Sequence, residues 1–145
     1  MATSVELEQQ EDFHFAIRFG GSIPTLDADE SPPLGKGAGP TPVQLLAAAV
    51  GNCLSDSLLF ALRKFKQAPE PIRTSVDTTV GRNAENRLRV QRIAVRLTLG
   101  APASALEHLD RALAQFEAFC TVAQSVRQGI EVDVAVYDST GARLN

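Results

Sequence analysis

The apolar segment GPTPVQLLAAAVGNCLSDSLLFAL, residues 39–62, limits the possible folds of this chain more than any other feature. Thr41 can cap a helix, and Pro42 suits the first helical position, where its missing N–H has no intrahelical acceptor. Apolar residues then continue around most of the helix as far as Leu62, and a helix of this kind is usually buried on most sides. The sequence therefore predicts a long buried central helix that ends before Pro69.

Four segments alternate apolar and polar residues with the period of a strand that is buried on one face. The middle two are joined by the polar turn GRNAEN. A long loop rich in glycine and proline, residues 20–41, precedes the helix, and connections of this length are usually functional or mobile. The four segments are residues 13–19, 72–80, 87–99 and 130–137.

A second helical region is expected between the third and fourth strands. SALE, starting at Ser104, has the spacing of a capping box, and TVAQ, starting at Thr121, repeats it. The region should therefore begin at Ser104, break near Cys120 and restart. Its inward stripe would be Leu106, Leu109, Leu113 and Phe116. The order of elements predicts an α+β fold with the central helix packed on antiparallel strands.

The chain has 145 residues, the length of about one domain. Residues 1–12 are polar and acidic and are expected to form a disordered tail, which leaves one domain over residues 13–145. The formal net charge of −3 argues against nucleic acid or an anionic membrane as the main partner. The stretch Leu45 to Gly51 is too short to span a bilayer, so a cytoplasmic location is expected.

The chain has two cysteines, Cys53 and Cys120, and two histidines. It lacks CxxC and HExxH spacings, so we expect no metal site and no cofactor. On the helix, Cys53 shares a largely apolar stripe, and an apolar site favours a neutral, inert thiol. Cys120 would lie just ahead of a helix N-terminus, where a thiolate is favoured. The stripe around Cys53 contains Leu46, Ala49, Val50, Ser57 and Phe60.

A buried cysteine becomes a nucleophile only if a cation or a hydrogen-bond donor stabilises its thiolate. Arginine suits this role because it stays protonated in an apolar pocket. The candidates are Arg18 on the first strand and Arg127 after Cys120. The sequence does not place either of them beside Cys53, and a solvated position on the surface is the alternative for both.

Two motifs, GAGPTPVQLLAAAVGNCLSDSL and FCTVAQSVRQGIEVDV, resemble those of the OsmC/Ohr family of thiol-dependent organic hydroperoxide reductases. The resemblance covers residues 13 to 138. It implies an intertwined homodimer in which long central helices pack between strands of both chains. It also implies that Cys53 attacks the peroxide and becomes a sulfenic acid, that Cys120 condenses with it to a disulfide, and that an external dithiol reduces the disulfide. Leu46, Val50 and Phe60 would then contact the organic group of the peroxide.

The chain departs from the family pattern at three positions. The activating arginine of a Gly-Gly-Arg motif is replaced by Ser22, its glutamate partner by Val43, and the proline after the second cysteine by Thr121. Arg18 is then the arginine nearest to the motif. Three hypotheses follow: a two-cysteine peroxidase, a dimer that binds an apolar small molecule without peroxidase chemistry, and a purely structural dimer.

Overall fold

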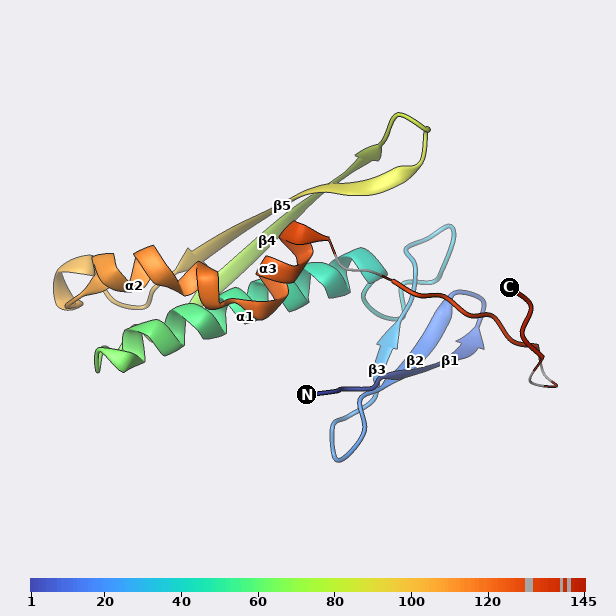
Figure 1. Ribbon diagram of the computed structural model, residues 1–145, viewed down its shortest axis with the longest axis horizontal. Helices are drawn as coiled ribbons and strands as arrows, with labels where there is room; N and C mark the ends of the chain where they lie inside the picture. Colours follow the sequence, from blue (N-terminus) through green and yellow to red (C-terminus); the bar gives the residue numbers. More distant parts are fainter. Residues whose placement is uncertain (130–131, 139, 141) are drawn as a thin grey trace.

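A computed structural model describes residues 1–129, 132–138, 140 and 142–145 of the chain (Figure 1). Two antiparallel sheets and three α-helices make up the described part, which confirms the predicted α+β class. The three-stranded sheet has the order β1-β2-β3, and the two-stranded sheet is the hairpin β4-β5. The elements are β1 (Glu6–Glu11), β2 (His14–Arg18), β3 (Leu26–Ala28), α1 (Pro42–Lys64), β4 (Arg73–Arg82), β5 (Leu88–Thr98), η1 (Ala103–Ala105), α2 (Leu109–Gln115), η2 (Phe116–Phe119) and α3 (Thr121–Gln128).

Helix α1 begins as the sequence predicts. The Thr41 hydroxyl accepts a hydrogen bond from the Gln44 N–H, and the Gln44 side chain accepts one from the Thr41 N–H, so the two residues form a capping box. The helix then packs one stripe of residues inward, against β4 and the helices that follow β5. This stripe consists of Val50, Gly51, Leu54, Leu58 and Leu62.

The opposite face of α1 is open in the single chain, so the expectation of burial on most sides is wrong at this level. Ala48, Asn52 and Asp56 are exposed, and the Phe60 side chain is 73% exposed. The helix is also long and apolar enough to cross a membrane by length and composition, a test that core helices of soluble proteins pass as well. Its contacts with β4, α2 and α3 make it the core helix of this domain.

The β4-β5 hairpin confirms the predicted strand pair and lies against α1. At the crossing, a Cβ on Gly51 would lie 2.6 Å from Cγ2 of Val76, so the helix can approach β4 this closely only with glycine. One turn later, the hydroxyls of Ser55 and Thr74 are 2.6 Å apart. These contacts fix the rotation of α1 on the hairpin, and with it the direction in which Cys53 points.

The N-terminal sheet differs from the sequence expectation. Part of the segment 1–12, expected to be a disordered tail, forms β1, whose six residues are all exposed. Backbone pairing with β2, in which Leu7 lies opposite Ile17, holds this strand in place. Because none of its side chains is buried, the strand has no alternating apolar pattern by which the sequence could have predicted it. In β2, Ile17 is buried, whereas the flanking Phe13 and Phe19 are 47% and 38% exposed. The apolar face of this sheet is therefore only partly covered within one chain.

The second helical region starts later than predicted. Instead of a helix capped at Ser104, the short η1 is followed by α2, whose N-cap is His108 with φ of 58°. The break near Cys120 and the restart at Thr121 are confirmed, because η2 ends at Phe119 and α3 begins at Thr121. Within the predicted stripe, Leu106 and Phe116 are buried and Leu113 is 48% exposed.

The predicted last strand, residues 130–137, is not formed in the part of it that the structure describes. Residues 130 and 131 lie outside the described residues, and residues 132–136 belong to no strand. Tyr137 makes an isolated antiparallel bridge with Arg143. Val132, Val134 and Val136 alternate along this segment and are 76%, 65% and 47% exposed. The strand pattern is present, and in the part of the chain that the structure describes this segment bonds to the last residues: the Leu144 N–H donates to the Val136 carbonyl at 2.8 Å.

The loop 20–41 is ordered around one buried carboxylate. Asp29 is 3% exposed, and it accepts hydrogen bonds from the backbone N–H groups of Glu30 at 2.8 Å, Lys36 at 3.0 Å and Ala38 at 3.1 Å. The Lys36 ammonium also pairs with Glu11 of β1 at 2.7 Å, which ties the loop to the N-terminal sheet. This loop leads directly into the capping box of α1.

Asp29→Asn is expected to lower the melting temperature at neutral pH. The Ala38 N–H, followed by the N–H groups of Lys36 and Glu30, holds the pKa of Asp29 below its ordinary value of 3.8, although burial opposes this. A lowered pKa in the folded state gives a stabilisation that is present above about pH 4 and lost as the pH falls through the folded-state value. The difference in melting temperature between wild type and variant should therefore shrink below about pH 4. A difference that does not change with pH would contradict this assignment.

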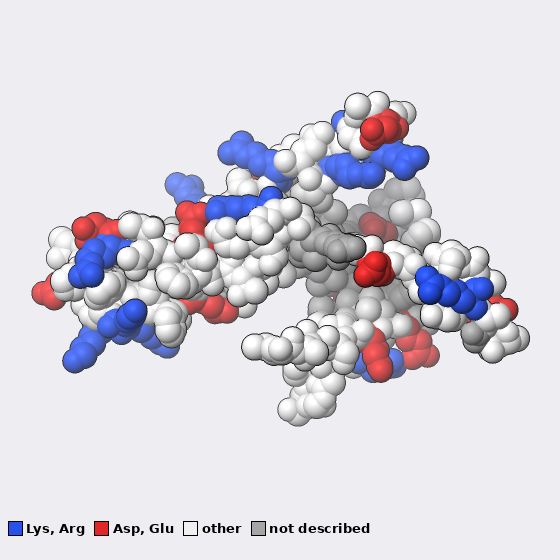
Figure 2. Space-filling view, viewed as in Figure 1, with Lys and Arg blue, Asp and Glu red and all other residues white. Residues whose placement is uncertain are grey.

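Charge is distributed unevenly between the two sheets. Strand β1 carries Glu6, Glu8 and Glu11, whereas the β4-β5 hairpin is rich in exposed arginines, and Figure 2 shows basic side chains along it. The only acidic residues between Arg73 and Thr98 are Asp77 and Glu85. The arginines are Arg73, Arg82, Arg87, Arg89, Arg92 and Arg96. The two sheets of one chain thus have opposite electrostatic character.

Candidate functional site

The two cysteines meet where α1 passes the junction of η2 and α3. Cys53 lies in the middle of α1, and Cys120 is the N-cap of α3. Both are free thiols, and the Cys53 side chain lies close enough to Cys120 to raise the pKa of that thiol. Cys120 is 0% exposed within the main hydrophobic cluster, and Cys53 packs against this cluster while remaining partly accessible. A molecule arriving from solvent can therefore reach Cys53, whereas Cys120 is enclosed.

The surroundings of Cys120 act on its ionisation in both directions. Burial raises the pKa of the thiol most, and the hydrogen bond to Cys53 raises it further. The backbone N–H of Ala123 and the hydroxyl of Ser57 lower the pKa, but they do not outweigh burial. The expectation that the helix N-terminus favours the thiolate of Cys120 is therefore wrong, because burial raises the pKa of this thiol. Burial thus favours the protonated thiol of Cys120.

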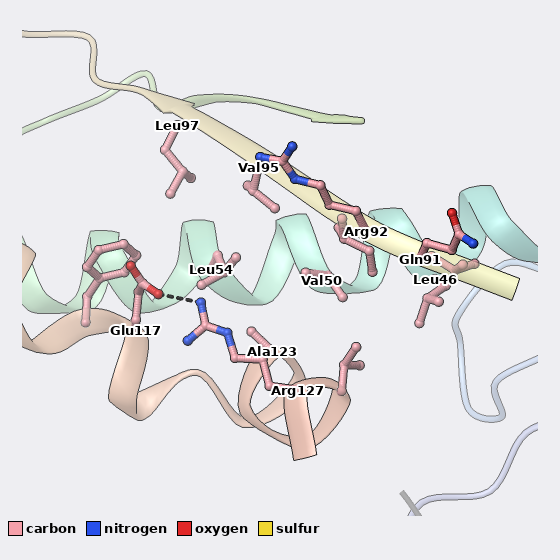
Figure 3. Close-up of a pocket in the computed structure, with 14 residues that line it drawn as sticks. Leu46, Val50, Leu54, Gln91, Arg92, Val95, Leu97, Glu117, Ala123 and Arg127 are labelled. Atoms are coloured by element: carbon pink, nitrogen blue, oxygen red, sulfur yellow. Dashed lines mark hydrogen bonds and ion pairs between the residues drawn. The ribbon is translucent and has the colours of Figure 1, made fainter. Parts of the chain in front are cut away.

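A pocket of about 500 Å³ with a mixed apolar and polar lining lies between α1, β5 and α3 (Figure 3). Leu46 and Val50, two of the predicted substrate-binding residues, line it together with Leu54. β5 supplies the opposite wall with Val95 and Leu97, and α3 supplies Ala123 and Val126. Hydrocarbon side chains thus line the pocket from all three elements, and polar side chains line it as well: Gln91, Arg92, Glu117 and Arg127.

A second pocket, of about 490 Å³, lies between α1, α2 and η2. Phe60, the third predicted substrate-binding residue, lines it, so the structure separates this residue from Leu46 and Val50. Phe119 and Ser57 also line it, and Phe116 lines both pockets. Along α1, the lining of the first pocket ends at Leu54 and that of the second begins at Asp56. Cys53 immediately precedes Leu54, and neither lining includes it.

The candidate arginines lie in different places. Arg18 is on β2 and pairs with Glu8 of β1 at 2.9 Å, in the N-terminal sheet. Arg127 lines the first pocket, and its guanidinium donates to the Glu117 carboxylate at 2.6 Å. Glu117 also holds the start of α3, because its carbonyl accepts from the Cys120 N–H. Sequence reasoning named Arg127 but missed Glu117 as its partner, since ten residues separate the two.

No group of three His, Cys, Asp or Glu side chains within the described residues has the arrangement of a metal site. The chemically reactive groups of the site are instead two sulfurs, the partly accessible one of Cys53 and the enclosed one of Cys120. Ser57 is a further member of this group that sequence reasoning did not assign. It follows Cys53 by four residues and so lies one helical turn away, on the same face.

Comparison with known proteins identifies the fold family. The family model of OsmC-like proteins matches residues 35–135, more than half of the chain. The chain belongs to the OsmC-like family. The match includes both cysteines and the whole of α1. No curated protein matches the sequence.

Solved structures of OsmC-like proteins share the fold at low sequence identity. A putative osmotic stress induced and detoxification response protein from Psychrobacter arcticus 273-4 is 18% identical with a TM-score of 0.73, over 86% of this chain and 88% of that chain. The organic hydroperoxide resistance protein OhrB of Bacillus subtilis is 14% identical with a TM-score of 0.64, over 88% and 91%. A putative organic hydroperoxide resistance protein from Vibrio cholerae, with captopril bound in one of its active sites, is 20% identical with a TM-score of 0.65, over 99% and 94%.

Proposed function

We propose that this OsmC-like protein reduces organic hydroperoxides with its two cysteines and acts in peroxide resistance in the cytoplasm. The observation that carries the proposal is that a partly accessible Cys53 packs against the hydrophobic cluster that contains the enclosed Cys120. A peroxidase of this type needs one sulfur that the peroxide can reach and a second sulfur close enough to form a disulfide with it. The structural similarity to organic hydroperoxide resistance proteins is consistent with this role.

The reaction has three balanced steps. The Cys53 thiolate attacks the O–O bond of the hydroperoxide, becomes a sulfenic acid and releases an alcohol after protonation. The Cys120 thiol then attacks the sulfenic sulfur, which forms the disulfide and releases water. An external dithiol donates two electrons and two protons, which restores both thiols. Leu46 and Val50 in the first pocket and Phe60 in the second would contact the organic group of the peroxide.

A cation near Cys53 would favour the thiolate. Arg127 is held by Glu117 at the edge of the first pocket, and we propose Arg18 of a second copy as the other candidate. Within one chain, Arg18 lies in the N-terminal sheet, so it would reach this site in a homodimer. Three features support a dimer: the open face of α1, the exposed valines of the strand-like segment 132–136, and the opposite charges of the two sheets.

One equivalent of cumene hydroperoxide is expected to convert both thiols to one intramolecular disulfide. Intact-mass spectrometry should show the loss of about two mass units, and peptide mapping should join Cys53 to Cys120. Hydrogen peroxide at the same concentration serves as the control, because the apolar pockets should favour the organic peroxide. Two free thiols after this treatment would rule the peroxidase out.

The alternative function is binding of an apolar small molecule without peroxide chemistry. The first pocket supports it, because hydrocarbon side chains from α1, β5 and α3 enclose about 500 Å³. The replacement of the family's arginine and glutamate by Ser22 and Val43 also supports it. Under this alternative, both thiols stay free after peroxide treatment, and an apolar ligand raises the melting temperature of wild type and Cys53→Ser alike.

A further inference from the structure

The lining of the second pocket is unusually aromatic for this chain. The chain has seven phenylalanines, and four of them line this pocket, where α2 and η2 lie beside α1 (Figure 1). Two of these rings are open to solvent, because Phe60 is 73% and Phe119 77% exposed. Aromatic rings attract a further ring through edge-to-face and offset contacts, so this lining favours an aryl group. The four residues are Phe60, Phe65, Phe116 and Phe119.

Two cations and one carboxylate belong to the same lining. The cations are Lys64 and Arg111, and neither forms an ion pair within the part of the chain that the structure describes. The carboxylate is Asp56, which accepts a hydrogen bond from the Asn52 amide at 3.1 Å. The charged groups of the pocket therefore have a positive sum, which favours an anionic ligand.

Arg111 is held beside the aromatic lining. Its guanidinium carbon lies 5.4 Å from the centroid of the Phe65 ring, the geometry of a cation–π contact. The His108 ring packs on the same phenylalanine, with 5.1 Å between the ring centroids. Lys64 precedes Phe65 in the last turn of α1. A guanidinium can bind a carboxylate through two parallel N–H bonds, so an acid group on an aryl ligand has a partner here.

The second pocket also borders residues next to both cysteines in the chain. Ser57 in its lining follows Cys53 by one helical turn, and Phe119 directly precedes Cys120. We propose that this pocket selects an organic hydroperoxide whose organic group is an aromatic ring that carries a carboxylate. The ring packs among the phenylalanines, and Arg111 and Lys64 hold the carboxylate. The proposal rests on the two-cysteine function proposed above and names the substrate class of that site.

The first pocket does not offer the same combination. Phe116, shared by both pockets, is the one aromatic residue among its described lining residues. Its Arg127 already pairs with the Glu117 carboxylate at 2.6 Å. Aliphatic side chains make up the rest of its apolar surface, so it suits an alkyl group better than an aryl acid.

The first test measures binding of para-isopropylbenzoate, an unreactive acid of this class, by titration calorimetry. The neutral para-isopropylbenzamide should bind about 3- to 5-fold more weakly, the size of one exposed ionic contact. Arg111→Gln should remove the preference for the acid, and Arg111→Lys should keep most of it. The matched control is Arg63→Gln, which removes the same charge from α1, because Arg63 pairs with Glu70 and lines neither pocket.

The second test uses the hydroperoxide of the same acid and compares it with cumene hydroperoxide in the first oxidation of the thiols. At concentrations below saturation, the acid should react about 3- to 5-fold faster with wild type and no faster with Arg111→Gln. Equal binding of acid and amide, or equal weakening by Arg63→Gln, would overturn the substrate class while leaving the peroxidase proposal standing. Binding that weakens as protein concentration rises would assign the pocket to a second copy and overturn it as well. Binding of the acid without oxidation by either hydroperoxide would overturn the peroxidase and the substrate class together.

Discussion

Cys53→Ser is expected to abolish consumption of organic hydroperoxide, with a loss of roughly 10³-fold or more, because a hydroxyl cannot replace the attacking thiolate. Cys53 is the accessible sulfur of the pair, and the enclosed Cys120 cannot take over from it. Loss of the peroxide is followed in steady state with dithiothreitol as the reductant. The fold should be unaffected, since serine is nearly isosteric with cysteine and Cys53 is only partly buried.

Cys120→Ser is the informative control for this result. Cys53 should still react once with cumene hydroperoxide, but its sulfenic acid has no resolving thiol and should be trapped by dimedone. Turnover with dithiothreitol should fall, while the first oxidation stays fast. A Cys120→Ser variant that loses the first oxidation and a Cys53→Ser variant that keeps it would reverse the two roles.

The same assay on Arg18→Ala and Arg127→Ala shows which arginine supports the attack, since only the variant that lacks this arginine should slow the first oxidation.

The sequence was most informative where a local interaction decides the structure. The capping box at Thr41 and Gln44, the hairpin between β4 and β5, and the restart at Thr121 all depend on residues close together in the chain. The same kind of reasoning failed at Ser104, where a local capping pattern gave way to η1 and to an α2 that starts from His108 with positive φ. Contacts with the rest of the fold outweighed that pattern.

The sequence identified the residues of the site but did not show how they are arranged in space. Both cysteines were named, and a resemblance paired them, but the two sulfurs are 67 positions apart and only the fold brings them together. The ionisation expected for Cys120 from its place before α3 was wrong because burial, which local sequence does not reveal, dominates there. Ser57 was seen only as part of an apolar stripe.

Leu58→Ala tests how far α1 depends on its buried stripe. Leu58 is 2% exposed within the main cluster, so its truncation should lower the free energy of unfolding by about 2–5 kcal/mol through lost burial and the remaining cavity. Urea unfolding, followed by circular dichroism at several protein concentrations, measures the loss. A cost below about 1 kcal/mol would mean that the packing of α1 on α2 and η2 is looser than the structure shows.

Phe60→Ala is the matched comparison on the same helix. Phe60 is 73% exposed in one chain, so a monomer should lose no more than about 0.5 kcal/mol from its truncation. In the proposed dimer, the open face of α1 is covered by a second copy, and the same change should then lower stability in a concentration-dependent way. A neutral Phe60→Ala, with an unfolding midpoint independent of protein concentration, would contradict the dimer. It would also leave Arg18 in the N-terminal sheet, paired with Glu8 and without a route to Cys53 through a partner chain.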